Sequence, residues 1–397
     1  MKTRRLKLII AACAGLATAA WTGIAISACG TAAEAKGDIS EPEDIDRFIL
    51  EKMDKAKIQG LAAVIIKDDA VAWTGNYGYA DAAAGLEVTA ETIFPVASIT
   101  KTVTGAAILQ LSEEGRVDLD ESINAYLPFK VAHPRFPASR ITLRMLLQHR
   151  SGIVDYDPVV EGVYTIKSGL PDPDMSLDDF LRAYLPEGGK WYDARKNFTK
   201  KAPGTEFAYS NVGFALVGYV VERVSGKPFN EYCRERIFAP LGMDSTGFFT
   251  REIDAAKLTL NYFKGKPLKP YSYASYPDGG LRTTTLDYAK FLRAIMNGGE
   301  ADGARILKES TMGAMLPDEL SKRLIWNEDP MKDFHVDSGG RVIVGHTGGD
   351  PGIVTAAYFN RANNVAVVIF VNTIPPSPLM YVQFKYIVER LNEFAGF

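Results

Sequence analysis

The most informative segment of the sequence is residues 94–115, FPVASITKTVTGAAILQLSEEG. A Phe-Pro pair opens it and a glycine ends it, and the residues between them predict one helix that runs from Ser98 to Glu114. Residues three apart on a helix share a face, so the Lys101 amine is within reach of the Ser98 hydroxyl. The segment therefore predicts a serine and a lysine side by side at the first turn of a helix.

Ser98 and Lys101 are the residue types of a serine nucleophile and of the base that activates it. A serine hydroxyl attacks a carbonyl well only when a neighbour takes its proton, and a lysine can do so when burial or a nearby cation lowers its pKa. Helix-terminal N–H groups and the helix dipole would favour the oxyanion that forms during the attack. A chain of this composition contains about one S-x-x-K by chance, so this pair, the only such match, needs support from elsewhere.

A second candidate group is Tyr209-Ser210-Asn211, which follows a Pro-Gly turn and opens a predicted helix over residues 212–224. On that turn the Tyr209 phenol can relay a proton, and the Asn211 amide can hold a substrate carbonyl. The alternative is a helix cap, because asparagine is common at helix starts. Tyr358-Phe359-Asn360 has the same Y-x-N pattern but lies within a predicted strand.

A third candidate group, His346-Thr347-Gly348-Gly349, ends a predicted strand and is followed by Asp350-Pro351-Gly352. Glycines there let a substrate backbone lie close to the strand edge, and the N–H of Gly349 can supply an oxyanion donor. The alternative for this segment is a plain turn.

Predicted strands lie near both ends of the chain, and predicted helices fill its middle. Residues 61–67 and 70–74 indicate a β-hairpin, and residues 342–344, 353–359 and 365–371 indicate further strands. Helices are predicted over residues 45–53, 142–148, 177–184, 212–224, 229–238, 286–296 and 380–391. The predicted fold class is α+β: an antiparallel sheet from both chain ends, flanked by helices, with an inserted and mostly helical subdomain.

The first residues are typical of an export signal, because a basic start, Met1–Lys7, precedes an uncharged run that ends at Cys29. The residues before Cys29 have the pattern of a lipoprotein cleavage site, which predicts a signal peptide over 1–28, a lipid on Cys29 and a linker over 29–43. Cleavage after Ala35 and an uncleaved anchor are the alternatives. We therefore expect an exported protein of the cell envelope, either periplasmic or held to the membrane by its lipid.

Composition argues against several kinds of function. The formal net charge of -3 gives no basic footprint for nucleic acid. Two of the three cysteines lie in the leader, so no intrachain disulfide is expected, and Cys233 is interpreted as a small buried hydrophobe. The four histidines form no HxxxH pair and no CxxC occurs, so we expect neither a metal site nor a cofactor.

Taken together, the order and flanks of the three motifs resemble the serine β-lactamase and penicillin-binding-protein family, nearest its class C, DD-peptidase and esterase branch. The likeness covers residues 44–373 and includes Leu146–Gly152, Pro203–Thr205, Pro240–Met243, Gly279–Thr283 and Gly345–Gly349. It implies one hydrolase domain over 44–397, with an α/β part at about 44–105 and 285–397 and a helical part at about 106–284.

By this resemblance Ser98 is acylated, Lys101 and Tyr209 share the proton transfers, and Asn211 binds the substrate together with the strand at His346. The N–H groups of Ser98 and Gly349 would form the oxyanion hole. The resemblance leaves open which of Lys101 and Tyr209 is the general base, and it implies a structural role for His149. The implied partner is a small molecule or peptide with a carbonyl to acylate.

His346 departs from the family's pattern, because the family's well-studied β-lactamases carry a lysine at this position. A lysine is a permanent cation that can hold a substrate carboxylate, whereas an ordinary imidazole is mostly neutral at pH 7. The resemblance therefore implies a DD-peptidase, D-aminopeptidase or esterase ahead of a β-lactamase. A non-catalytic ligand-binding or sensor protein on the same fold is the alternative of another class, and the intact motif residues Ser98, Lys101 and Tyr209 argue against it.

Overall fold

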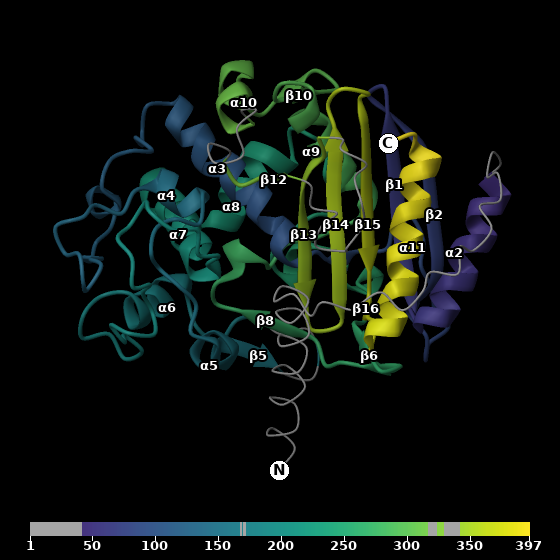
Figure 1. Cartoon of the computed structure of the whole chain (residues 1–397), viewed down its shortest axis with the longest axis horizontal. Coiled ribbons are helices and arrows are strands. Elements are labelled where there is room, and N and C mark those ends of the chain that lie inside the picture. Colours follow the sequence, from purple (N-terminus) through teal and green to yellow (C-terminus); the bar gives the residue numbers. More distant parts are fainter. Residues whose placement is uncertain (1–41, 167–168, 170–171, 317–323, 329–341) are drawn as a thin grey trace, which may run out of the picture. The chain divides into compact units, whose positions relative to one another are not determined.

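A computed structural model describes residues 42–166, 169, 172–316, 324–328 and 342–397 (Figure 1). The predicted signal peptide, its alternatives and most of the linker lie outside these residues. Contacts divide the chain into two compact units, and we describe each by itself. Among the described residues, unit 1 comprises residues 42–90, 259–268 and 342–397, and unit 2 comprises the described parts of 91–258 and 269–328. The predicted divisions, at about residues 105 and 285, lie elsewhere along the chain.

Unit 1 is built on an antiparallel sheet that joins the two ends of the chain. Its strands follow the order β13-β14-β15-β1-β2-β3, in which β15 pairs with β1 over Leu61↔Val371 to Lys67↔Val365. The bounds are β1 Gly60–Lys67, β2 Ala70–Asp81, β3 Leu86–Glu87, β13 Val344–Asp350, β14 Ile353–Asn360 and β15 Val365–Val371. A smaller sheet combines β16 (Thr373–Ile374), β6 (Tyr262–Phe263) and β7 (Lys266–Pro267). The predicted hairpin and the predicted origin of the sheet are confirmed.

Two helices pack together against this sheet, α2 (Pro42–Ala56) and α11 (Pro378–Ala395) (Figure 1). Apolar residues recur every three or four positions along both, so each helix buries one stripe. The buried members are Ile45, Ile49 and Met53 on α2 and Phe384, Ile387, Val388 and Leu391 on α11. Ser377 caps the start of α11 and Gly396 ends it with a left-handed backbone. Met380, predicted to share the stripe, is only partly buried.

One strand differs from its prediction. Residues 342–344 were expected to form it, with His346–Gly349 at its end, but β13 begins at Val344 and continues to Asp350. Three of the seven residues of β13 are glycines, which are weak strand formers. Pairing with β14 over Val344↔Phe359 to Asp350↔Ile353 nevertheless keeps them extended, and the turn comes later, at Gly352 with φ +75°. The third motif therefore lies near the end of a strand, as predicted, and the alternative of a plain turn is wrong.

Unit 2 is mostly helical. Its main helices are α3 (Thr100–Glu113), α4 (Leu143–Leu147), α5 (Asp157–Val160), α6 (Leu177–Tyr184), α7 (Asn211–Ser225), α8 (Phe229–Cys233), α9 (Thr285–Met296) and α10 (Glu309–Met315). Short strands pair as β4 (Phe94–Pro95) with β9 (Arg282–Thr283), β5 (Tyr164–Ile166) with β8 (Tyr271–Tyr273), and β10 (Glu300–Ala301) with β11 (Ala304–Arg305). Asn327–Glu328 form β12.

Helix α3 lies in the interior of unit 2, because all its residues from Thr100 to Leu111 are buried. It packs against α7, whose residues 212–221 are buried as well. The remaining predicted helices are confirmed, with one change: α8 ends at Cys233 and a π-helical turn over Arg234–Phe238 completes the predicted segment. Cys233 is free and buried, and burial raises the pKa of its thiol well above the ordinary value, as expected of a structural cysteine.

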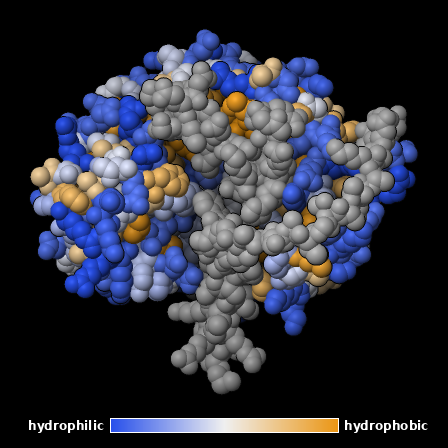
Figure 2. Space-filling model, in the orientation of Figure 1, coloured by the Kyte–Doolittle hydropathy of each residue, from blue (hydrophilic) through white to orange (hydrophobic). Residues whose placement is uncertain are grey.

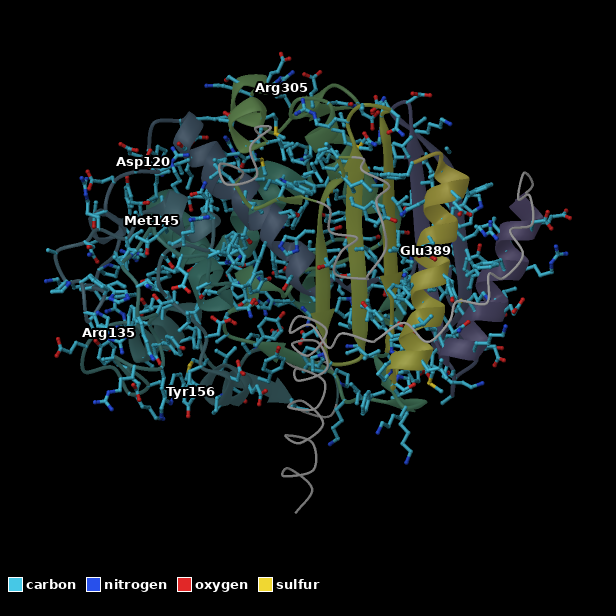
Figure 3. The ribbon with its side chains drawn as sticks, in the orientation of Figure 1. Asp120, Arg135, Met145, Tyr156, Arg305 and Glu389 are labelled. Carbon is cyan, nitrogen blue, oxygen red and sulfur yellow. The ribbon has the colours of Figure 1, made fainter. Side chains whose placement is uncertain are left out.

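Many charged residues lie on the surface. The view in Figure 2 is largely hydrophilic, with scattered apolar residues. Arg305, which pairs with Glu300, and Glu389, which pairs with Lys385, are labelled in Figure 3. Within the described residues, no helix is long and apolar enough to cross a membrane.

A glycine on α7 permits close packing next to the candidate site. A Cβ on Gly218 would lie 2.3 Å from the Cβ of Pro277, on the turn that leads to Asp278. We therefore expect Gly218→Ala to lower the free energy of unfolding by about 1–3 kcal/mol, measured by denaturant titration. Gly313→Ala on α10 is the matched control, because a Cβ there meets nothing within 4 Å, and it should leave stability equal or higher. An equal loss in both variants would contradict the packing argument.

Candidate active site

Ser98 lies in a tight turn, Ala97–Ile99, immediately before α3. Ala97 has a left-handed backbone with φ +50°, a conformation that costs about 1–3 kcal/mol and persists only where the surroundings enforce it. The surroundings here are the segment at Leu281: Val96 N–H donates to Leu281 O at 3.0 Å, and Leu281 N–H donates to Thr100 Oγ1 at 3.1 Å. The turn leaves Ser98 partly exposed, while its neighbours Ala97 and Ile99 are buried.

Lys101 is fully buried beside Ser98 and contacts three oxygen atoms. Its Nζ lies 3.1 Å from Ser98 Oγ, 2.7 Å from Asn211 Oδ1 and 2.7 Å from the backbone oxygen of Asp278. A neutral amine has two N–H groups and one lone pair. The two oxygens that only accept, from Asn211 and Asp278, can take the two N–H groups, and the lone pair then faces the Ser98 hydroxyl. The geometry therefore suits a lysine that accepts the proton of Ser98.

Tyr209 lies on the turn before α7, as its motif predicted. Its ring stacks on the His149 ring, with centroids 4.2 Å apart and planes inclined by 28°. Lys101 Nζ lies 5.0 Å from the centroid of the Tyr209 ring, within the range of a cation–π contact. Tyr209 and Lys101 are thus neighbours in the structure, although 108 positions separate them in the sequence.

Asn211 is the first residue of α7, but it does not cap the helix. Ser210 is the cap, and its Oγ accepts from Gly213 N–H at 2.9 Å. The Asn211 amide is therefore available for Lys101. The alternative interpretation of Asn211 as a helix cap is wrong.

His346, Thr347, Gly348 and Gly349 lie on β13 in unit 1, whereas Ser98, Lys101, Tyr209 and Asn211 lie in unit 2. His346 is buried, and its Nδ1 lies 2.6 Å from Thr347 O, which makes Nδ1 the protonated ring nitrogen because a carbonyl can only accept. Gly349 is exposed. The substrate-binding role expected for this segment stays a prediction.

Sequence reasoning missed two contributors to the site, Asp155 and Asp278. Asp155 accepts hydrogen bonds from Ser210 Oγ, Asn211 N–H and Val212 N–H. Burial raises the pKa of its carboxyl group, while these hydrogen bonds and the Lys101 charge act in the opposite direction. Asp278 contributes only its backbone oxygen, which no residue-type motif can reveal. A segment dense in Asp, such as the one around Asp155, gives no signal that singles out one carboxylate.

The structure also shows which group the His149 ring binds. Its Nδ1 accepts from the backbone N–H of Ser210 at 3.1 Å, so this nitrogen is committed to the backbone of the turn. A structural role for His149 agrees with this contact. Within the described part of the chain, no group of three or more His, Cys, Asp or Glu residues could hold a metal ion.

Comparison with known proteins supplies the family. Residues 45–391 match the family model described as Beta-lactamase. The chain belongs to the β-lactamase family. This makes it a serine hydrolase by family and confirms the resemblance stated above.

Two relatives of this β-lactamase-family protein illustrate the relationship. Protein flp of Staphylococcus aureus (strain MW2) is 25% identical over 344 residues, which is 83% of this chain and 66% of that protein. The chain thus spans just under two thirds of that relative's length. A penicillin-binding protein homologue from Pyrococcus abyssi superposes with a TM-score of 0.69 at 27% identity, covering 87% of this chain and 77% of that one.

A third comparison concerns the fold alone. A D-amino acid amidase from Ochrobactrum anthropi SV3 has a TM-score of 0.67 at 21% identity, covering 88% of this chain and 99% of that one. The α+β fold class is therefore confirmed by the observed sheet and by structural relatives.

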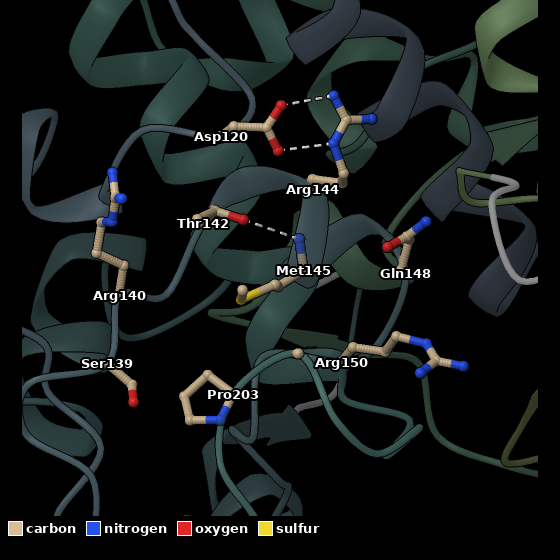
Figure 4. Close-up of a pocket in the computed structure, with 10 residues that line it drawn as sticks. Asp120, Ser139, Arg140, Thr142, Arg144, Met145, Gln148, Arg150 and Pro203 are labelled. Atoms are coloured by element: carbon tan, nitrogen blue, oxygen red, sulfur yellow. Dashed lines mark hydrogen bonds and ion pairs between the residues drawn. The ribbon is translucent and has the colours of Figure 1, made fainter.

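A separate hollow lies in unit 2 beside α4 and has a volume of about 490 Å³. Three arginines reach it, and one of them, Arg144, is paired with both oxygens of Asp120 at 2.7 and 2.8 Å (Figure 4). Ser98, Lys101, Tyr209 and Asn211 do not line it. This hollow is therefore distinct from the candidate active site.

The Tyr209 phenol can be tested separately from its ring. Tyr209→Phe keeps the stacking on His149 but removes the hydroxyl, so we expect turnover to fall by about 10²–10⁴-fold with an unchanged thermal midpoint. Steady-state kinetics and thermal unfolding measure the two effects. Tyr232→Phe is the matched control, because its buried hydroxyl has no hydrogen-bond partner among the described residues, and its turnover should not change. A Tyr209→Phe enzyme as fast as the control would exclude the phenol from proton transfer.

Proposed function

We propose that this protein is an exported serine hydrolase that forms an acyl-enzyme at Ser98 and cleaves an amide or ester of the D-amino-acid peptide or small-ester type. The observation that carries the proposal is the position of Lys101 Nζ, 3.1 Å from Ser98 Oγ and held by Asn211 and Asp278. Family membership supports the class of reaction.

The proposed acylation step uses the residues of unit 2. Ser98 Oγ attacks the substrate carbonyl carbon while its proton passes to the Lys101 amine, directly or through Tyr209. The tetrahedral oxyanion then collapses, the bond to the amine or alcohol breaks, and the proton is delivered to that leaving group. The Ser98 N–H at the start of the α3 segment can stabilise the oxyanion. The products of this step are an ester on Ser98 and a free amine or alcohol.

Deacylation is the same chemistry with water as the nucleophile. A water molecule gives one proton to the base and adds to the ester carbonyl, and Ser98 Oγ regains a proton as the carboxylic acid leaves. The net reaction consumes one water for each bond broken.

Two features support the proposed substrate class. His346 stands where β-lactamases of the family carry a lysine, so this chain lacks that fixed cation for a β-lactam carboxylate. The structural relative from Ochrobactrum anthropi SV3 is a D-amino acid amidase, and we propose the same class of substrate for this chain.

A substrate panel tests the proposal. We expect turnover of a short-chain p-nitrophenyl ester or a D-amino-acid p-nitroanilide to exceed that of the L-p-nitroanilide and of a chromogenic cephalosporin. Faster turnover of the cephalosporin would instead identify a β-lactamase. No turnover of any of them, together with no labelling by a serine-directed probe, would favour the non-catalytic alternative.

We also propose export with a lipid on Cys29. Bacterial expression with an alkyne-labelled fatty acid should label the wild-type chain and not a Cys29→Ala variant. Labelling that persists in the variant would exclude Cys29 as the lipid site.

A further inference from the structure

Asp155 receives three hydrogen bonds at the start of α7. Its Oδ2 accepts from Asn211 N–H at 2.8 Å, and its Oδ1 accepts from Val212 N–H and from Ser210 Oγ, both at 3.0 Å. The first N–H groups of a helix have no partner within the helix, so a carboxylate there satisfies them and complements the helix dipole. Ser210 Oγ thus donates to Asp155 while it accepts from Gly213 N–H.

The other side of the same turn is held by His149. Ser210 N–H donates to His149 Nδ1 at 3.1 Å, and Ala208 N–H donates to His149 O at 2.7 Å. The His149 ring also stacks on Tyr209. Residues 208–212 are therefore fixed from two directions, by Asp155 and by His149.

This turn leads directly to the nucleophile. Asn211, whose N–H binds Asp155, uses its side-chain oxygen to accept from Lys101 Nζ at 2.7 Å. Lys101 in turn contacts Ser98 Oγ at 3.1 Å. A small shift of the first turn of α7 would move the Asn211 amide and with it the amine that faces Ser98.

We propose that Asp155 is a positioning residue, which fixes the Tyr209-Ser210-Asn211 turn against Lys101 and so sets the rate at which Ser98 is acylated. Asp155 touches the turn and not the substrate. The proposal rests on the proposed acyl-enzyme function. It predicts that Asp155 affects the chemical step more than it affects the initial binding of a substrate or probe.

The test is Asp155→Asn, which keeps the shape of the side chain. The carboxylate offers two acceptor oxygens to three donors, whereas the amide places an NH₂ group against an N–H or O–H donor. In stopped-flow measurements with the short-chain p-nitrophenyl ester, we expect the maximal acylation rate constant to fall by about 10–100-fold, because misplaced reacting groups slow the chemical step by such a factor. The binding constant of the ester should change little.

Asp287→Asn is the matched control. Asp287 is also a buried carboxylate in unit 2, and it accepts from Ser245 N–H at 2.7 Å and Thr246 Oγ1 at 3.0 Å without contacting the turn at Tyr209. It should lose stability but acylate at the wild-type rate. Equal acylation rates in Asp155→Asn and wild type, or equal slowing in both variants, would overturn the proposal.

A milder variant covers the case in which Asp155→Asn does not fold. Ser210→Ala removes one of the three donors to Asp155 together with the cap on Gly213 N–H, but leaves both backbone N–H groups in place, so it should fold with a small loss of stability and still slow acylation. Hydrogen exchange of the peptide spanning residues 207–214 should rise in this variant above the wild-type level. Unchanged exchange and an unchanged acylation rate would overturn the role of Asp155. A wild-type chain that is not labelled at Ser98 would instead overturn the proposed function, and this proposal with it.

Discussion

Ser98→Ala is expected to reduce turnover of the best amide or ester substrate by at least about a thousandfold, because it removes the hydroxyl that forms the acyl-enzyme. The residual rate would reflect binding and oxyanion stabilisation with water as the nucleophile. Ser98 is partly exposed, and the hydrogen bond that the structure gives its hydroxyl is the one with Lys101, so the thermal midpoint should change little. Steady-state kinetics on wild type and variant give the ratio.

Ser225→Ala is the control for this prediction. Ser225 is the last residue of α7, and its hydroxyl contacts only the backbone of Lys227 among the described residues. Its removal should leave turnover unchanged. If Ser98→Ala retained more than a few per cent of wild-type turnover while the protein was folded, Ser98 would not be the nucleophile.

Lys101→Met is expected to lower the rate of acylation by about 10²–10⁴-fold, the contribution of a positioned proton-transfer group. Methionine has a similar length but neither a lone pair for the Ser98 proton nor an N–H group for its neighbours. The buried oxygens of Asn211 and Asp278 would lose this donor, so the free energy of unfolding should also fall, by about 1–3 kcal/mol. Stopped-flow acylation and denaturant titration measure the two effects.

Lys290→Met separates the loss of stability from the loss of activity. Lys290 on α9 is another lysine of unit 2 that donates to a backbone oxygen, that of Gly242, and it also donates to Asp287 at 2.9 Å. This variant should lose stability and keep the acylation rate. Similar slowing in the two lysine variants would mean that Lys101 acts through folding and not through proton transfer.

Hydropathy patterning predicted the fold well where local signals agree with tertiary packing. Helix α6 was predicted with the observed bounds, Leu177–Tyr184, since a serine caps its start and its apolar residues form one stripe. Strands β14 and β15 were predicted because nearly every residue is apolar and every one is buried. The strand β13 was placed too early because three of its seven residues are glycines, which are weak strand formers, and these residues are held extended by pairing with β14.

Part of the candidate site was also predictable from local sequence signals. Spacing alone placed Lys101 beside Ser98, since the contact is made within one helical turn. The contacts of Lys101 with Asn211 and with Asp278 span 110 and 177 positions, so they depend on how α3, α7 and the turn at Asp278 pack. The position of Tyr209 and Asn211 at a predicted helix start indicated both residues, and the resemblance supported them. Neither signal indicated Asp155, which is recognised by its three hydrogen bonds.

Intact-mass spectrometry after treatment with a fluorophosphonate probe and with a slowly turned-over ester or penicillin tests the acylation of Ser98 most directly. We expect one adduct per wild-type chain, located by peptide mapping to the peptide that contains Ser98, and no adduct in folded Ser98→Ala. An adduct of the same mass that persists in Ser98→Ala would contradict the assignment of the nucleophile.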